Sequence, residues 1–158
     1  MKYQIIPVTP FQQNCSLIWC EKTKRAVVVD PGGNIDRIQN EVAKLGLVLE
    51  KILLTHGHID HVGGAKALAK AANVPIIGPH IADKFWIDNL PKQSQNFGFP
   101  HCDAFEPDQY LQDGDIVKVG EQSLSVLHCP GHTPGHIALF SAQSKLAWVG
   151  DILFRSSI

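Results

Sequence analysis

The feature that most constrains the fold is the segment LLTHGHIDHVGG, residues 53–64, where three histidines and one aspartate fall within six positions. The run KILLT, residues 51–55, leads directly into this cluster, and two adjacent glycines follow it. The run predicts a buried strand, and the glycines disfavour a regular helix through the segment. We therefore expect a loop at a strand end that gathers four ligand-type side chains in one place.

The spacing within this cluster favours metal binding over a histidine-rich surface. Residues i and i+2 at a strand end point the same way, so His56 and His58 can converge on one point. The chain then turns, and Asp60 and His61 can face a second point nearby. Imidazole and carboxylate are good ligands for Zn²⁺ and similar ions. A bound cation also keeps crowded imidazoles deprotonated, which removes their mutual repulsion.

Two further segments carry side chains of the same kind. In HCPGHTPGH, residues 128–136, His132 lies on a turn at Gly131, and flanking prolines fix backbone φ angles that hold the loop. Asp151 follows the strand-like run LAWV, where its carboxylate can bridge two metals. Asp30 also ends a strand-like run before glycines, and we expect it behind the ligands rather than on a metal.

The first half of the chain alternates strand and helix patterns. AVVVD, residues 26–30, predicts a central strand buried on both faces. Apolar residues at helical spacing predict a helix over residues 35–45, with Asn34 as its N-cap and Gly46 as its C-terminal stop.

The second half predicts a long loop and then hairpins. Residues 90–107 hold three prolines and many polar residues, which predicts a loop of the kind that often forms a lid or substrate wall. Two hairpins are expected, turning near residues 120–121 and 143–144. With no linker or repeat, residues 1–158 predict a single domain.

Composition narrows the class of partner. Lys and Arg number 14 against 15 Asp and Glu, a formal net charge of −1, so no basic face for nucleic acid is implied. We expect no secretory signal and no membrane-spanning run, and four scattered cysteines do not make a disulfide framework. We expect a cytoplasmic protein with a small-molecule substrate, no nucleic acid and no membrane partner; nothing in the sequence sets its oligomeric state.

Taken together, the motifs THGHIDHVGG, PGHTPGH and GD resemble those of the metallo-β-lactamase superfamily. Within it, DPGG, PGHTPGH and GDILF are most similar to type II glyoxalases, the hydroxyacylglutathione hydrolases, in their short bacterial form. The resemblance spans nearly the whole chain. It implies an α/β (α+β) fold, the four-layer αββα sandwich, with metals at one edge between the two sheets.

The resemblance also implies two divalent metal ions, with zinc expected and iron or manganese as alternatives, because the same ligands suit all three. Three histidines would hold the first metal, an aspartate and a histidine the second, and one carboxylate would bridge them. In this order the ligands are His56, His58 and His132; Asp60 and His61; and Asp151. Asp60 would also orient the attacking water, its catalytic role, while Asp30 and His136 would hold ligands from behind.

The chain departs from the family pattern after GDILF. Family members continue there with more strand and helix, and supply one further histidine to the second metal. No histidine follows Asp151 in this sequence. We therefore expect an incomplete second metal site and a sandwich that lacks its usual C-terminal elements.

The implied reaction is hydrolysis of a thioester. By resemblance, S-2-hydroxyacylglutathione (S-lactoylglutathione above all) is cleaved to glutathione and a 2-hydroxy acid by metal-bound hydroxide, and a thiolate leaves without a strong general acid. Two alternatives stay open. The superfamily includes persulfide (sulfur) dioxygenases with a single Fe(II), for which His56, His132 and Asp151 would supply the ligands. The other alternative is an inactive metal-binding fragment.

Overall fold

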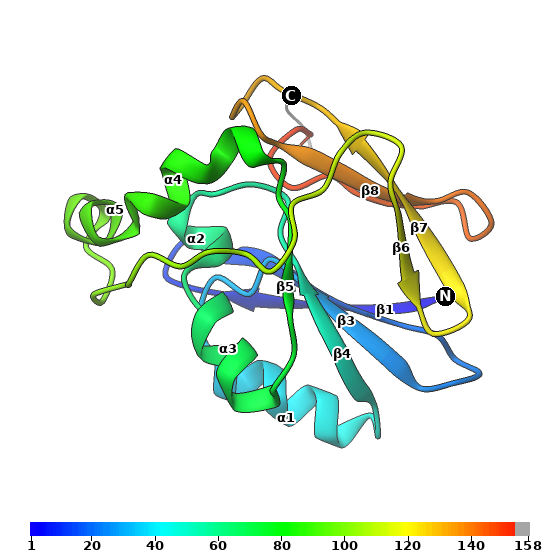
Figure 1. Cartoon of the computed structure of the whole chain (residues 1–158). Coiled ribbons are helices and arrows are strands. Elements are labelled where there is room, and N and C mark those ends of the chain that lie inside the picture. The colour runs from blue at the N-terminus through cyan, green and yellow to red at the C-terminus, as the bar shows by residue number, and fades with distance from the viewer. Residues whose placement is uncertain (154–158) are drawn as a thin grey trace.

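A computed structural model describes residues 1–153 and shows two sheets that face each other (Figure 1). The first sheet has five strands, and their order across the sheet follows the chain. The strands β1 to β3 run antiparallel, and β3, β4 and β5 run parallel. They are β1 (Lys2–Val8), β2 (Gln13–Trp19), β3 (Arg25–Val29), β4 (Val48–Leu53) and β5 (Ile76–Ile77).

The second sheet is an antiparallel meander of four strands, again in chain order. Both expected hairpins belong to it, with turns between β6 and β7 and between β8 and β9. Its strands are β6 (Ile116–Val119), β7 (Gln122–His128), β8 (Ile137–Ser141) and β9 (Leu146–Trp148).

Along the chain, the helices occur in the connections between strands of the first sheet and in the connection from the first sheet to the second. Figure 1 places α1 and α3 on the side of the first sheet that faces away from the second sheet. The helices are α1 (Ile35–Lys44), α2 (Ile59–Val62), α3 (Ala65–Ala72), the 3₁₀ turn η1 (Ile81–Asp83), α4 (Lys84–Asp88) and α5 (Leu90–Phe97).

Two apolar clusters hold the layers together. One lies between the first sheet and its helices and includes Val28, Ile38 and Leu68. The other lies between the sheets and includes Val27 and Leu139, but no residue from a helix. Alternate residues of β3 thus serve different clusters, as expected for a strand buried on both faces. Of the four layers expected, residues 1–153 form one helical layer and the two facing sheets.

Two local expectations were wrong. Residues 90–97 form α5 rather than the start of a loop, because Pro91 stands in the first helical turn, where a missing N–H costs nothing. Asn34 occupies the N-cap position of α1 but does not cap it; its side-chain oxygen instead accepts a hydrogen bond from Thr9 N at 2.8 Å. The expected stop at Gly46 is confirmed by a φ of +66°.

Strand ends from both sheets meet at one edge. Because β3 and β4 are parallel, Asp30 and Thr55 leave the sheet side by side. Ile137 at the start of β8 donates its N–H to Thr55 O at 2.8 Å, which joins the second sheet to the same edge. Among the described residues, no helix is long and apolar enough to cross a bilayer.

Candidate metal centre

The segment after β4 places four side chains of the histidine cluster around one edge of the sandwich. His56 and His58 lie on the extended stretch before α2, whereas Asp60 and His61 lie on α2 itself. A loop was expected for all four side chains, but Asp60 and His61 lie on this helix of a single turn. His56 and His61 are buried, and His58 and Asp60 are half-buried.

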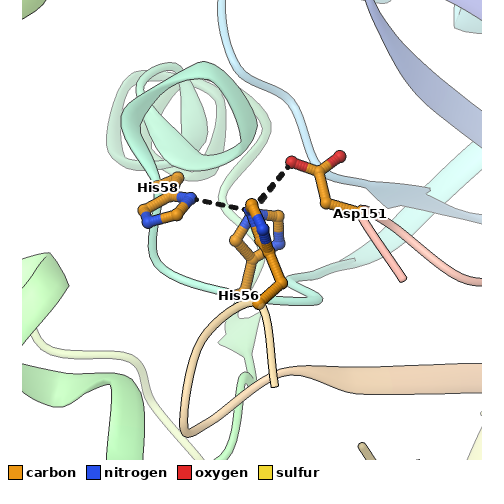
Figure 2. A group of neighbouring side chains, drawn as sticks. His56, His58 and Asp151 are labelled. Carbon is orange, nitrogen blue, oxygen red and sulfur yellow. Dashed lines mark hydrogen bonds and ion pairs between the residues drawn. The ribbon is translucent and has the colours of Figure 1, made fainter. Parts of the chain in front are cut away.

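The β7–β8 loop and the segment after β9 bring further side chains to these histidines. His132 Nε2 lies 3.1 Å from His58 Nδ1 and 3.2 Å from Asp151 Oδ2. Asp151 Oδ2 also lies 3.6 Å from His56 Nε2. Figure 2 shows His56, His58 and Asp151 pointing toward one another, although 95 positions separate the first from the last.

Two groups of nitrogen and oxygen atoms share one carboxylate. In the second group, His61 Nε2 lies 3.2 Å from Asp151 Oδ1 and 3.6 Å from Asp60 Oδ2. The ligand-type atoms within each group all lie within 4.8 Å of one another, a separation that one cation can span. The two groups that share Asp151 are His56, His58, His132 and Asp151; and Asp60, His61 and Asp151. A third group, fully buried, comprises Asp30, His56 and His61. The structure thus brings together all six residues that the sequence suggested as ligands.

Asp30 lies behind the histidines and aims two of them. Its Oδ2 accepts from the Thr55 hydroxyl at 2.6 Å and lies 2.8 Å from His61 Nδ1. The Thr55 hydroxyl has one hydrogen, which goes to Asp30, so its oxygen accepts from His56 Nδ1 at 3.0 Å. Both imidazoles therefore direct Nε2 toward the centre, as a ligand must.

His136 supports the backbone at Asp151. Its Nδ1 lies 3.0 Å from Ile137 O and its Nε2 lies 3.1 Å from the backbone nitrogen of Asp151, which donates to it. Its ring also stacks on His56 at 4.4 Å between centroids. His136 thus fixes where the segment after β9 approaches the histidines.

Burial keeps His56 and His58 neutral. It lowers the pKa of His56 to about 3 and that of His58 to about 4, and neighbouring histidines add to the effect. A neutral imidazole offers the lone pair that a metal needs. At neutral pH these two side chains are therefore ready to bind a cation.

In the second group, neighbouring charges as well as burial shift the pKa values. Burial would lower the pKa of His61, but the nearby carboxylates of Asp151 and Asp30 raise it to about 10. Burial would likewise raise the pKa of Asp151, yet His56 and His61 hold it well below its usual range. Burial raises the pKa of Asp60. The carboxylates of Asp30, Asp60 and Asp151 surround the site, and their negative charge would favour a bound cation.

The unpaired atoms support a metal at this centre. Among the buried side-chain atoms without a hydrogen-bond partner are the Nε2 atoms of His56 and His61. A buried polar atom without a partner costs free energy, and a cation bound there would remove that cost. The nitrogen and carboxylate donors also fit zinc, iron and manganese.

A cavity of about 480 Å³ opens beside the second group. Asp60, His61 and Asp151 line it on one side. The other walls mix apolar with amide side chains from β1, the β1–β2 turn, β2 and β9. They include Ile5, Phe11, Gln12, Gln13, Asn14 and Trp148. The size suits a small molecule rather than a polymer.

Sequence reasoning missed the residues that support the loops. Thr55 was assigned only to a strand, Gln93 was assigned to a loop, and Asp83 was not singled out. All three are buried and contact the histidine segments. For Thr55, its place directly before the first histidine was the available signal. Asp83 and Gln93 are polar residues in segments without a motif, so no local pattern distinguished them.

Comparisons with known proteins agree with this architecture. Residues 8–158 match the family model of the metallo-beta-lactamase superfamily. The chain is 48% identical over 159 residues to hydroxyacylglutathione hydrolase GloC of Haemophilus influenzae, covering 100% of this chain and 74% of that protein.

Two solved structures show the same arrangement. BLEG-1 B3 metallo-beta-lactamase has a TM-score of 0.87 and 29% identity, covering 98% of this chain and 74% of that one. TTHA1623 in a di-iron-bound form has a TM-score of 0.87 and 30% identity, covering 98% and 75%. Family model, relative and fold lead to one conclusion: the chain belongs to the metallo-β-lactamase superfamily.

Proposed function

We propose that this chain hydrolyses a small thioester of the S-2-hydroxyacylglutathione type, with two divalent ions at the centre described above. The family and the related hydroxyacylglutathione hydrolase identify it as a metallo-hydrolase. The observation that carries the proposal is the pair of ligand groups that share Asp151 beside a cavity of small-molecule size. S-lactoylglutathione is the substrate to test first.

Each of the two ions would bind one of the two ligand groups that share Asp151. Three histidines with Asp151 fit the first ion, and Asp60 and His61 with Asp151 fit the second. Zinc is the expected ion because imidazole and carboxylate suit it. Iron is the next candidate, since the similar TTHA1623 structure is a di-iron-bound form.

The chain's own residues would position substrate and water. When bound, the cations supply a water that ionises near neutral pH and a Lewis acid for the carbonyl oxygen. Asp60 is half-buried at the cavity wall, where its free carboxylate oxygen can accept from that water and orient it. A thiolate is a good leaving group, so no acid from the protein has to protonate it.

Metal analysis combined with a thioester assay tests the proposal. Protein loaded with zinc or iron should cleave S-lactoylglutathione, and Asp151→Asn should lower kcat/KM at least about 100-fold while it reduces the metal content. His101→Asn, an exposed loop position outside the centre, is the matched control and should leave both unchanged. Metal-loaded protein that leaves the thioester intact would overturn the assignment.

A second candidate is persulfide oxidation at a single Fe(II). It is favoured by one observation, that His56, His132 and Asp151 lie in one group and supply two imidazoles and one carboxylate. One iron per chain, with oxygen uptake on adding a persulfide, would select this reaction. Metal binding without either turnover would select the inactive metal-binding fragment.

A further inference from the structure

Asp83 is a fully buried carboxylate that belongs to neither ligand group. It ends η1, and its side chain has no exposed surface. Its Oδ2 accepts from Gly57 N at 2.9 Å and from the Thr133 hydroxyl at 2.8 Å, while its Oδ1 accepts from Gly135 N at 2.7 Å. All three partners are donors, so both oxygens act as acceptors only.

Two of these partners lie next to residues of the first ligand group, and Gly135 lies on the same loop as His132. Gly57 separates His56 from His58, and Thr133 directly follows His132. One carboxylate therefore connects the histidine loop after β4 to the β7–β8 loop. In the sequence, His58 on the first loop and His132 on the second are 74 positions apart. None of the ion pairs among residues 1–153 includes Asp83, so these hydrogen bonds alone replace its hydration.

Both loops approach the η1–α4 segment closely. A Cβ at Gly135 would lie 2.4 Å from Asp83 N, and one at Gly57 would lie 2.7 Å from Trp86 Cβ. Both glycines thus allow the loops to sit directly on the η1–α4 segment. A buried carboxylate that lost one donor would be left partly unsatisfied at high cost, so seating one loop favours seating the other.

We propose that Asp83 is a positioning residue that sets the distance between the His56–His58 pair and His132, and so preorganises the first metal group. Asp83 is in none of the ligand groups and does not line the cavity beside them. The inference rests on the metal centre of the proposed function but not on the identity of the thioester.

The test is Asp83→Asn, which keeps the size of the side chain and replaces one acceptor oxygen with an NH₂ that cannot accept. Metal affinity should fall by about 10–100-fold, the effect usual for residues that hold ligands in place. The measurement is competition with a chromophoric chelator, together with the visible spectrum of the Co²⁺-loaded protein, which should change shape. Asp88→Asn is the matched control, because Asp88 is an exposed carboxylate on the adjacent helix α4, paired with Lys84.

Thr133→Val provides a second, milder variant that removes one hydrogen bond and keeps the shape. It should lower metal affinity less than Asp83→Asn, and the double variant should lose less than the sum of the two, since both act on one contact. If Asp83→Asn does not fold, Thr133→Val decides alone.

The outcomes separate this inference from the proposed function. Wild-type protein that binds no metal contradicts the metal centre and with it the proposed function. Wild-type protein that binds metal, with variants of unchanged affinity and unchanged Co²⁺ spectrum, overturns only the role of Asp83. A variant that loses thermal stability but keeps wild-type affinity in its folded form likewise overturns it, because Asp83 would then be merely structural.

Discussion

Single residues at this centre depend on contacts that are far apart in the sequence. The ligand types were predictable, because His56, His58, Asp60 and His61 stand within six positions. Asp83 was not, because its partners lie 26, 50 and 52 positions away and only the folded chain brings them together. Its polar character predicts exposure, whereas three donors make burial tolerable.

Gly135 lies so close to Asp83 that a side chain there should cost stability. Gly135→Ala should destabilise the metal-free protein by about 1–3 kcal/mol, because the added methyl would overlap Asp83 and force it aside. Urea unfolding followed by circular dichroism measures this change. Gly131→Ala lies in the same loop with no neighbouring atom within 4 Å of the added carbon, and should match the wild type. Equal stability of the two variants would contradict the tight seating of the loop on Asp83.

At the scale of elements, strands and the helix α1 were predictable from periodicity, but the segment after α4 was not. Three prolines in residues 90–107 suggested a loop, although proline is tolerated in the first helical turn and only the interior disfavours it. The error mattered for the site. Helix α5 carries Gln93, whose side-chain oxygen accepts from Ile59 N at 2.9 Å and whose nitrogen donates to Gly57 O at 3.2 Å.

Gln93→Leu tests this role of α5. The variant keeps the approximate size of the side chain but leaves the buried Ile59 N–H without a partner, so the free energy of unfolding should fall by about 1–3 kcal/mol. Gln95→Leu, an exposed position on the same helix, should stay within about 0.5 kcal/mol of wild type. Chemical denaturation of the metal-free proteins compares them, and a similar loss in both would rule out a specific contact of Gln93 with α2.

The junction of β7 with the segment before η1 predicts a dependence of stability on pH. The His80 and His128 rings stack at 3.9 Å, and burial together with His128 lowers the pKa of His80. The unfolded chain binds a proton at His80 near pH 6.5, whereas the folded chain resists it, so stability should fall as pH drops below about 6.5.

His80→Asn isolates this effect. Asparagine retains an acceptor for Ala82 N, which now donates to His80 Nδ1 at 3.1 Å, but it does not titrate. The decrease in Tm between pH 7.5 and pH 5.5, measured on metal-free protein, should therefore be smaller in the variant. An identical decrease in both proteins would show that the stacked pair does not contribute.

At the scale of the whole molecule, the motifs predicted a fold that no single element could. The resemblance to the family predicted the two facing sheets and the position of the site at their edge. Strand ends from both sheets must meet there, because otherwise Asp151 could not reach His56. The single domain and the cytoplasmic location stay predictions.

Metal binding should stabilise the entire fold, because the centre joins segments from both sheets. At a free zinc concentration about 100 times Kd, binding adds about 2.7 kcal/mol, which corresponds to a rise in Tm of about 5–10 °C. Melting curves followed by circular dichroism with zinc, and again after a chelator, measure it. Asp151→Asn should abolish most of the rise, and a wild-type Tm indifferent to zinc would contradict the centre.

The sharing of Asp151 between the two groups has a consequence for how the centre fills. In the proposed two-ion state, the occupancy of one position changes the charge and orientation of a carboxylate that also serves the other, so the two affinities are thermodynamically linked. The binding isotherm of the metal should then be cooperative or anticooperative rather than the sum of two independent isotherms. A mutation that changes the metal affinity of one position should also change the affinity of the other.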